Sequence, residues 1–123
     1  MSEPTYQDAS LLLQLMQIHA MNDLSAANSW LWSDQFIPDY EDFIKKYPTG
    51  SEENRNVSKI CGHFETIGTL WKHNLINEGL LFDWLAITIV WERVKGYALG
   101  VRQASGEPRL FENFEAMAKA ATV

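Results

Sequence analysis

Apolar residues recur at intervals of three and four along almost the whole chain, and the strict alternation that marks strands is nearly absent. Residues that end helices divide this pattern into about six segments. The predicted fold class is all-α, a single-domain bundle of about six helices. We expect these helices at residues 5–22, 25–35, 40–47, 51–74, 77–104 and 108–121.

Several expected helices begin at residues whose side chains accept hydrogen bonds from free backbone N–H groups. Thr5 and Asp8 have the spacing of a capping box, and Ser51 precedes the fourth segment. The fourth helix ends at Asn74 or at Gly79, because either residue suits the left-handed conformation that closes a helix. The last helix is expected to begin with the proline of "SGEP" in its first turn.

The fifth expected helix is apolar on every side between Leu80 and Trp91, which is typical of an element surrounded by others. We therefore expect it to pair with the fourth helix, antiparallel, as the core of the bundle. Gly96 and Gly100 share one side of its second half, and each costs up to about 1 kcal/mol relative to alanine. This cost indicates a neighbouring backbone that approaches closely, in the last helix or in a second chain.

Two sets of apolar side chains are expected in the core. The first helix is expected to bury one stripe, which comprises Leu11, Leu12, Leu15, Met16, Ile18 and Leu24. The second set is the tryptophans, which bury large areas. Trp30 and Trp32 are two residues apart on a helix and cannot both face inward. One of them is therefore a candidate for an exposed contact surface.

The composition, 46% hydrophobic and 21% charged, is that of a folded protein, and we expect residues 1–123 to form one domain. The net charge of -6 repels phosphate backbones and anionic lipids, so neither nucleic acid nor a membrane surface is an expected partner. The single cysteine and the lack of an apolar leader in "MSEPTYQD" favour a cytoplasmic protein.

Residues with versatile chemistry gather between positions 59 and 74. Cys61, His63, Glu65 and His73 all lie there. On a helical projection, His63 and Glu65 fall on opposite flanks of the apolar stripe, and His73 lies among polar residues. Metal ligands on one helix need a spacing of three or four, and a cysteine–histidine pair needs hydrogen-bond contact. The spacing favours structural use, with no catalytic residue, no metal and no cofactor.

Two carboxylates lie where an unpaired charge would be costly. Glu65 borders the apolar stripe of the fourth helix, and Asp83 lies in the segment that is apolar on every side. Each carboxylate must therefore reach water, a helix N-terminus or a cation. An ion pair or a solvent contact is one interpretation, and a ligand-binding carboxylate is the other.

The second half of the chain resembles a known family. The segments "VSKICGHFETIGTLWKHNLIN", "LLFDWL" and "GEPRLFENFEAMAKAA", with Trp91 and Arg102 between the last two, are similar in order and spacing to small helical prokaryotic proteins catalogued as a domain of unknown function. The resemblance covers Val57 to Ala120. It implies a helical fold in which Asn74 closes the fourth helix and Asn77 starts the fifth, and it attaches no activity to any residue.

The first functional hypothesis is a non-enzymatic helical module that binds a protein partner or associates with itself. Its contact surface would include an exposed Trp30 or Trp32, or the side that carries Gly96 and Gly100.

The alternative hypothesis is a sensor or carrier that holds a small-molecule ligand between the fourth and fifth helices. Its polar anchors would be Glu65, Asp83, Trp91 or Arg102. A hydrolase or metalloenzyme is the least favoured class, because the chain carries no nucleophile motif and no phosphate-binding loop.

Overall fold

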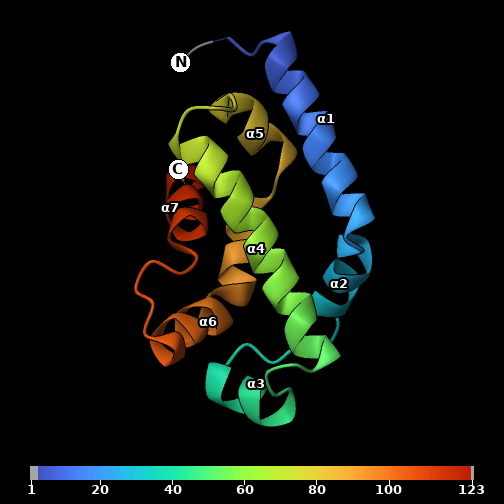
Figure 1. The fold of residues 1–123 in the computed structure, drawn as a ribbon, viewed down its shortest axis with the longest axis vertical. Helices are drawn as coiled ribbons and strands as arrows, with labels where there is room; N and C mark the ends of the chain where they lie inside the picture. Colours follow the sequence, from blue (N-terminus) through green and yellow to red (C-terminus); the bar gives the residue numbers. More distant parts are fainter. Residues whose placement is uncertain (1–2, 123) are drawn as a thin grey trace.

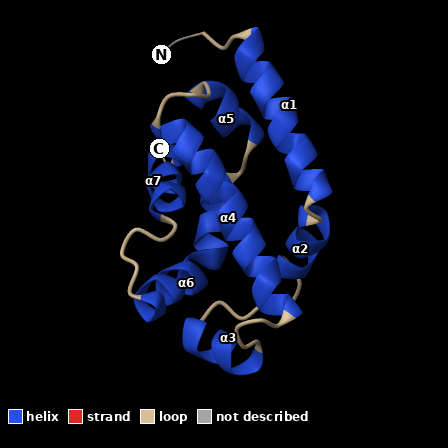
Figure 2. Cartoon of the chain, viewed as in Figure 1, coloured by secondary structure: helices blue, strands red, loops and turns tan. Residues whose placement is uncertain are grey.

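The computed structural model describes residues 3–122 and shows a helical protein (Figures 1 and 2). Seven helices and no strand occur in this range, which confirms the all-α fold class. The helices are α1 (Tyr6–Met21), α2 (Leu24–Leu31), α3 (Tyr40–Lys46), α4 (Glu52–Lys72), α5 (Glu78–Trp84), α6 (Ile87–Ser105) and α7 (Glu112–Ala121).

Helix α4 runs through the middle of the molecule (Figure 1). Helices α1 and α2 lie along one side of it and α7 along the other, while α5 and α3 lie near its two ends. Helix α4 packs most extensively against α7 and α2, and less extensively against α6. The predicted pair of long helices is therefore not confirmed as the core of the fold.

The buried apolar side chains form one continuous cluster to which every helix contributes. Five helices, α2 to α5 and α7, each place a large side chain in it with no more than trace exposure: Leu31, Phe43, Ile67, Leu81 and Phe114. In the part of the chain that the structure describes, none of the helices has the length and hydropathy needed to cross a membrane.

The predicted helix starts are confirmed where a side chain caps the helix locally. The Thr5 hydroxyl accepts a hydrogen bond from the Asp8 amide at 3.1 Å, and the Asp8 carboxylate accepts one from the Thr5 amide at 2.8 Å. The side chains of Ser51 and Asn77 cap α4 and α5, each by accepting one hydrogen bond from a backbone amide in the first turn. Asn74 has a φ of 57°, the left-handed conformation predicted for the end of the fourth helix.

The predicted fifth helix is in fact two helices, α5 and α6, separated by Leu85 and Ala86. Leu85 is extended, with φ −110° and ψ 133°. Each shorter helix buries only one side: Leu81 and Ile87 are buried, whereas Asp83 and Ile89 are exposed. The apolar residues on every side arise because two helices with different directions share the segment. The prediction of one central helix here is therefore wrong, and the described residues form seven helices where about six were predicted.

Helix α2 ends at Leu31, four residues earlier than predicted, and the carbonyl group of this last residue has a partner from far along the chain. The Arg93 guanidinium of α6 donates hydrogen bonds to the Leu31 carbonyl at 2.9 and 3.0 Å and to the Ser33 carbonyl at 3.0 Å. A cation at the C-terminus of a helix also suits the helix dipole.

The prediction that one of the two neighbouring tryptophans is exposed is confirmed. Trp30 is partly buried and meets the rings of Phe43 and Tyr47 edge to face, with centroids 6.5 and 5.4 Å away. Trp32 is 44% exposed, and the Arg93 guanidinium lies 5.3 Å from its ring. Trp30 is therefore a core residue, and Trp32 remains on the surface.

Candidate functional site

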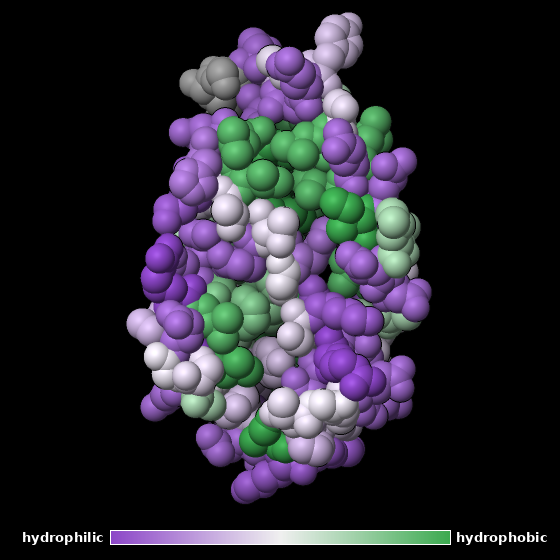
Figure 3. All heavy atoms as spheres, viewed as in Figure 1, coloured by the Kyte–Doolittle hydropathy of each residue, from purple (hydrophilic) through white to green (hydrophobic). Residues whose placement is uncertain are grey.

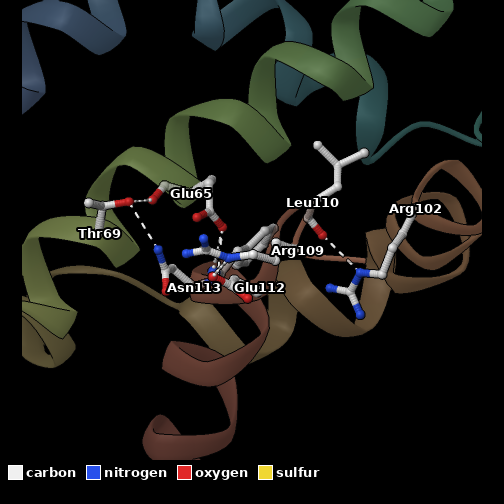
Figure 4. A network of polar contacts seen from close by, with 8 residues as sticks. Glu65, Thr69, Arg102, Arg109, Leu110, Glu112 and Asn113 are labelled. Atoms are coloured by element: carbon white, nitrogen blue, oxygen red, sulfur yellow. Dashed lines mark hydrogen bonds and ion pairs between the residues drawn. The ribbon is translucent and has the colours of Figure 1, made fainter. Parts of the chain in front are cut away.

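Glu65 caps helix α7 from the neighbouring helix α4. Its Oε1 accepts hydrogen bonds from the backbone amides of Asn113 at 3.0 Å and Phe114 at 2.9 Å (Figure 4). Helix α7 has no side-chain cap of its own, because its N-cap residue is Phe111. The negative charge also lies at the positive end of the helix dipole. Of the three environments predicted for this carboxylate, the structure shows a helix N-terminus.

This cap explains why the last helix begins at Glu112 instead of at Pro108. The residues before it form turns, and Phe111 adopts a left-handed conformation with φ 60°. The chain is thereby redirected so that the first free amides of α7 point at Glu65, as Figure 4 shows from close by.

Trp91 and Arg102 hold α7 from the opposite side, on α6. The Phe114 ring lies between Phe64, stacked at 4.9 Å, and Trp91, edge to face at 5.0 Å. Arg102 donates from Nε to the Leu110 carbonyl at 2.9 Å and from Nη1 to the Glu115 carboxylate at 3.0 Å. We call Glu65, Trp91 and Arg102 the α7 clasp, because each attaches this helix to the rest of the protein.

Among the described residues, the Nη2 atom of Arg102 is buried without a hydrogen-bond partner. The whole side chain is 19% exposed and already makes two strong contacts, so this atom reflects the geometry of the clasp.

Asp83, the fourth anchor predicted for a ligand pocket, is not part of this arrangement. It is exposed on α5, so the question of a buried, unpaired charge does not arise. Trp91 lines a groove between α6 and α7, and Arg102 borders a different shallow hollow. The structure does not bring the four predicted anchors together.

The close approach predicted at Gly96 and Gly100 is confirmed, but the neighbour is neither the last helix nor a second chain, and at Gly100 it is a side chain instead of a backbone. A Cβ atom at position 96 would overlap the Pro38 carbonyl oxygen, and one at position 100 would overlap the Tyr40 ring. The start of α3 and the loop before it therefore cover this side of α6. Pro38 and Tyr40 occupy the space beside these two glycines.

A third close approach, which the sequence analysis missed, occurs at Gly68 in α4. A Cβ atom there would lie 2.8 Å from the backbone carbon and oxygen of Asn113. Gly68 follows Glu65 by three residues and so shares its side of the helix. This spacing next to a capping carboxylate is the sequence signal that could have identified the contact with α7.

Helix α1 is attached to the protein along one narrow side. Leu15 is its buried residue, and Leu11 packs against the core cluster beside it. Near one end, Asp8 Oδ1 accepts a hydrogen bond from the Asn77 amide at 2.9 Å. Near the other end, the His19 ring meets the His63 ring edge to face at 5.5 Å.

The opposite side of α1 is apolar as well, and it faces solvent. Met16 on this side is 47% exposed, although the sequence analysis assigned it to the buried stripe. Ile18, assigned to the same stripe, lies on the side of Leu15, where it lines a groove, and is 44% exposed. We call one line of exposed residues on this helix the outer stripe. It consists of Tyr6, Ala9, Leu13, Met16 and Ala20.

Figure 3 shows hydrophobic surface over α5 and the neighbouring half of α1, with further hydrophobic atoms along α1 at the edge of the molecule. Tyr6 is almost fully exposed, and Leu13 is 60% exposed. The helix therefore has apolar residues on both sides, of which the protein itself covers only one.

The comparisons with known proteins place the chain in a family. The family DUF4760, described as a domain of unknown function, matches residues 4–121. The chain belongs to this family. The match confirms the resemblance found from Val57 onward and extends it over α1 to α3, so the DUF4760 domain includes the outer stripe. No curated protein and no solved structure matches the chain.

In this DUF4760 chain, the residues between positions 59 and 74 face different surroundings. Cys61 is fully buried, and burial raises the pKa of its thiol far above the ordinary value. His63 lies beside a groove of 560 Å³ between α1, α2 and α4, whose lining includes Leu15, Ile18 and Lys59. Among residues 3–122, no three His, Cys, Asp or Glu side chains are grouped so as to hold a metal ion.

His63 is expected to make the stability of the protein depend on pH. Burial, and then a charge on His19, lower its pKa below the ordinary 6.5. As the pH falls below that value, His63 binds a proton more readily in the unfolded chain than in the folded protein. The free energy of unfolding therefore decreases as the pH falls. We expect His63→Gln to lose less stability than the unaltered protein between about pH 8 and about pH 5, measured by urea denaturation.

Asp8 does not interfere with this comparison. Its pKa is lowered by hydrogen bonds, the largest effect coming from the Thr5 amide, so its contribution is lost only below the ordinary 3.8. Equal losses of stability in His63→Gln and the unaltered protein would show that the folded ring takes up its proton freely.

Proposed function

We propose that this protein is a non-enzymatic module that binds another protein through the outer side of α1. The observation that carries the proposal is the outer stripe, a line of exposed apolar side chains on a helix whose other side is already packed. Removing apolar area from water contributes about 25 cal/mol per Å² toward association, before the entropic costs of binding are subtracted.

Most of the other candidate residues, apart from the exposed Trp32 and Asp83, support this assignment by their contacts within the fold. The α7 clasp and the two glycines of α6 attach one part of the chain to another, and Trp30 is packed among aromatic rings. These contacts within the fold give each of these residues a structural role that needs no ligand. Together they make a firm frame that presents α1 at the edge of the molecule, as Figure 1 shows.

A second candidate function is a small-ligand carrier, because the groove beside His63 has a volume in the range of ligand sites. This groove lies between α1, α2 and α4, not between the two long helices as the sequence analysis predicted. A ligand there would raise the melting temperature of the protein.

Photo-cross-linking from α1 tests the proposed function. A benzophenone amino acid at position 13, introduced in the cells that make the protein, is expected to form a covalent adduct with a protein, which peptide mass spectrometry identifies. The matched control is position 89 on α6, because Leu13 and Ile89 are both 60% exposed. Adducts from neither position, or equal adducts from both, would contradict binding through α1.

A further inference from the structure

We infer that the protein bound by the outer stripe is a second copy of this chain, so that two α1 helices pair across a two-fold axis. The inference rests on the proposed function and adds the identity of the partner. It is drawn from the spacing of the stripe, the charges around it and the charge of the whole chain.

The spacing of the outer stripe indicates that its partner is a helix. Its five members follow one another at intervals of three, four, three and four residues: Tyr6, Ala9, Leu13, Met16 and Ala20. This alternation repeats every seven residues and is the pattern of the two core positions of a coiled coil. The outer stripe faces away from Leu15, the buried residue of α1.

The exposed flanks of the stripe carry no charged side chain. Asp8 and His19, the ionisable residues within its length, face the protein, where they contact Asn77 and His63. The ten residues from Ala9 to Ile18 contain no ionisable side chain. In coiled coils, charged residues beside the seam usually set the choice of partner. Here one flank carries Ser10, Gln14 and Gln17, whose polar groups both donate and accept hydrogen bonds, and the other carries the partly buried Leu12 and His19. Such a surface is complementary to itself, as a two-fold interface requires.

The overall charge favours the same place of contact. Two copies with a net charge of -6 repel each other, and this repulsion is weakest where the meeting surfaces are uncharged. Helix α1 has no Lys or Arg, so it lacks the basic face with which helices bind anionic membranes or nucleic acid. Compared with a membrane or a nucleic acid, these charges favour a second copy of the chain that contacts the first through the uncharged surface of α1.

The length of the stripe sets the strength of the dimer. It spans just over two heptads of a helix of 16 residues, about 24 Å long. Stable coiled coils usually sustain the pattern over about three to four heptads. We therefore expect a reversible dimer whose population rises with protein concentration.

Sedimentation velocity over a range of micromolar concentrations tests the dimer. The unaltered chain is expected to shift from 14.1 kDa toward twice that mass as its concentration rises. Leu13→Lys places a charge in the middle of the seam and should weaken association about tenfold or more. Ile89→Lys, at a site of equal exposure, should associate as the unaltered chain does.

Cysteine cross-linking locates the contact by a different substitution. Cys61 is fully buried, so a cysteine introduced at position 13 is the thiol that a short bismaleimide can reach. Leu13→Cys is expected to give a cross-linked dimer, and Ile89→Cys is expected to stay monomeric. Because both positions are exposed, neither substitution is expected to disturb the fold. Unchanged melting curves will confirm that both variants fold.

A monomer at every concentration would overturn the inference, as would a dimer that Leu13→Lys leaves unchanged. The proposed function fails separately. If position 13 cross-links to a different protein in cells while the purified chain is monomeric, the proposed protein-binding function stands and a second copy is excluded as the partner. If position 13 cross-links to nothing and the chain is monomeric, both are wrong.

Discussion

Replacing Gly68 with alanine is expected to lower the free energy of unfolding by about 2 kcal/mol. The new methyl group would lie 2.8 Å from the backbone carbon and oxygen of Asn113, at the most extensive helix contact of the fold. Backbone atoms cannot rotate away as the end of a flexible side chain can, so α7 must shift as a whole. The better helix propensity of alanine, worth up to about 1 kcal/mol, offsets only part of this cost.

The matched control lies six residues earlier in the same helix. A Cβ atom at Gly62 would meet open space, so Gly62→Ala should raise the free energy of unfolding by up to about 1 kcal/mol. Urea denaturation of the two variants should therefore move the midpoint in opposite directions. If both variants gain stability, α4 and α7 do not approach as closely at Gly68 as the structure shows.

Glu65→Ala is expected to lower the free energy of unfolding by about 2 kcal/mol. The substitution removes an acceptor for two backbone amides of α7, which has no other side-chain cap. Glu65→Gln keeps a carbonyl acceptor and loses only the charge, whose interaction with the helix dipole is worth about 0.3–1 kcal/mol. The glutamine variant should therefore be the more stable of the two.

Two measurements separate this capping role from ligand binding. Urea denaturation gives the loss of stability, and hydrogen exchange should show faster exchange at the Asn113 and Phe114 amides in the alanine variant. If neither variant loses stability, Glu65 does not support α7, and it returns to the candidates for a ligand site.

Features that depend on neighbours in sequence could be predicted from the sequence. The Thr5 capping box and the Ser51 cap were predicted, because in both cases the partner groups lie within a few residues. For the end of the fourth helix the residues left Asn74 and Gly79 open, and the family resemblance favoured Asn74, which is left-handed in the structure. The all-α class follows from the same local periodicity.

Features set by distant contacts could not be predicted. Helix α2 ends at Leu31, whose carbonyl group accepts hydrogen bonds from Arg93, 62 residues later in the chain. The break at Leu85 and Ala86 has no glycine or proline to mark it. There the chain turns so that each helix buries its own apolar side, which depends on how the other helices pack.

The candidate site shows the same division. A helix N-terminus was among the expected environments of Glu65, but only the structure identifies that helix as α7. The glycines of α6 were expected to face a close neighbour, and the sequence could not show that Pro38 and Tyr40 fill the space. The sequence analysis did not identify the outer stripe and assigned Met16 to the buried side, because exposure depends on which side of α1 meets the core.

Most of the protein is packed against itself, and α1 is covered on one side only. The mass of the purified protein therefore tests whether it binds another protein chain or a small molecule. Native mass spectrometry of the protein, purified gently from the cells that make it, reports bound chains and bound small molecules together. We expect the 14.1 kDa chain within an assembly of protein chains, without added small-molecule mass. A single chain that carries a stoichiometric small molecule would contradict a protein-binding module and favour a carrier with its site beside His63.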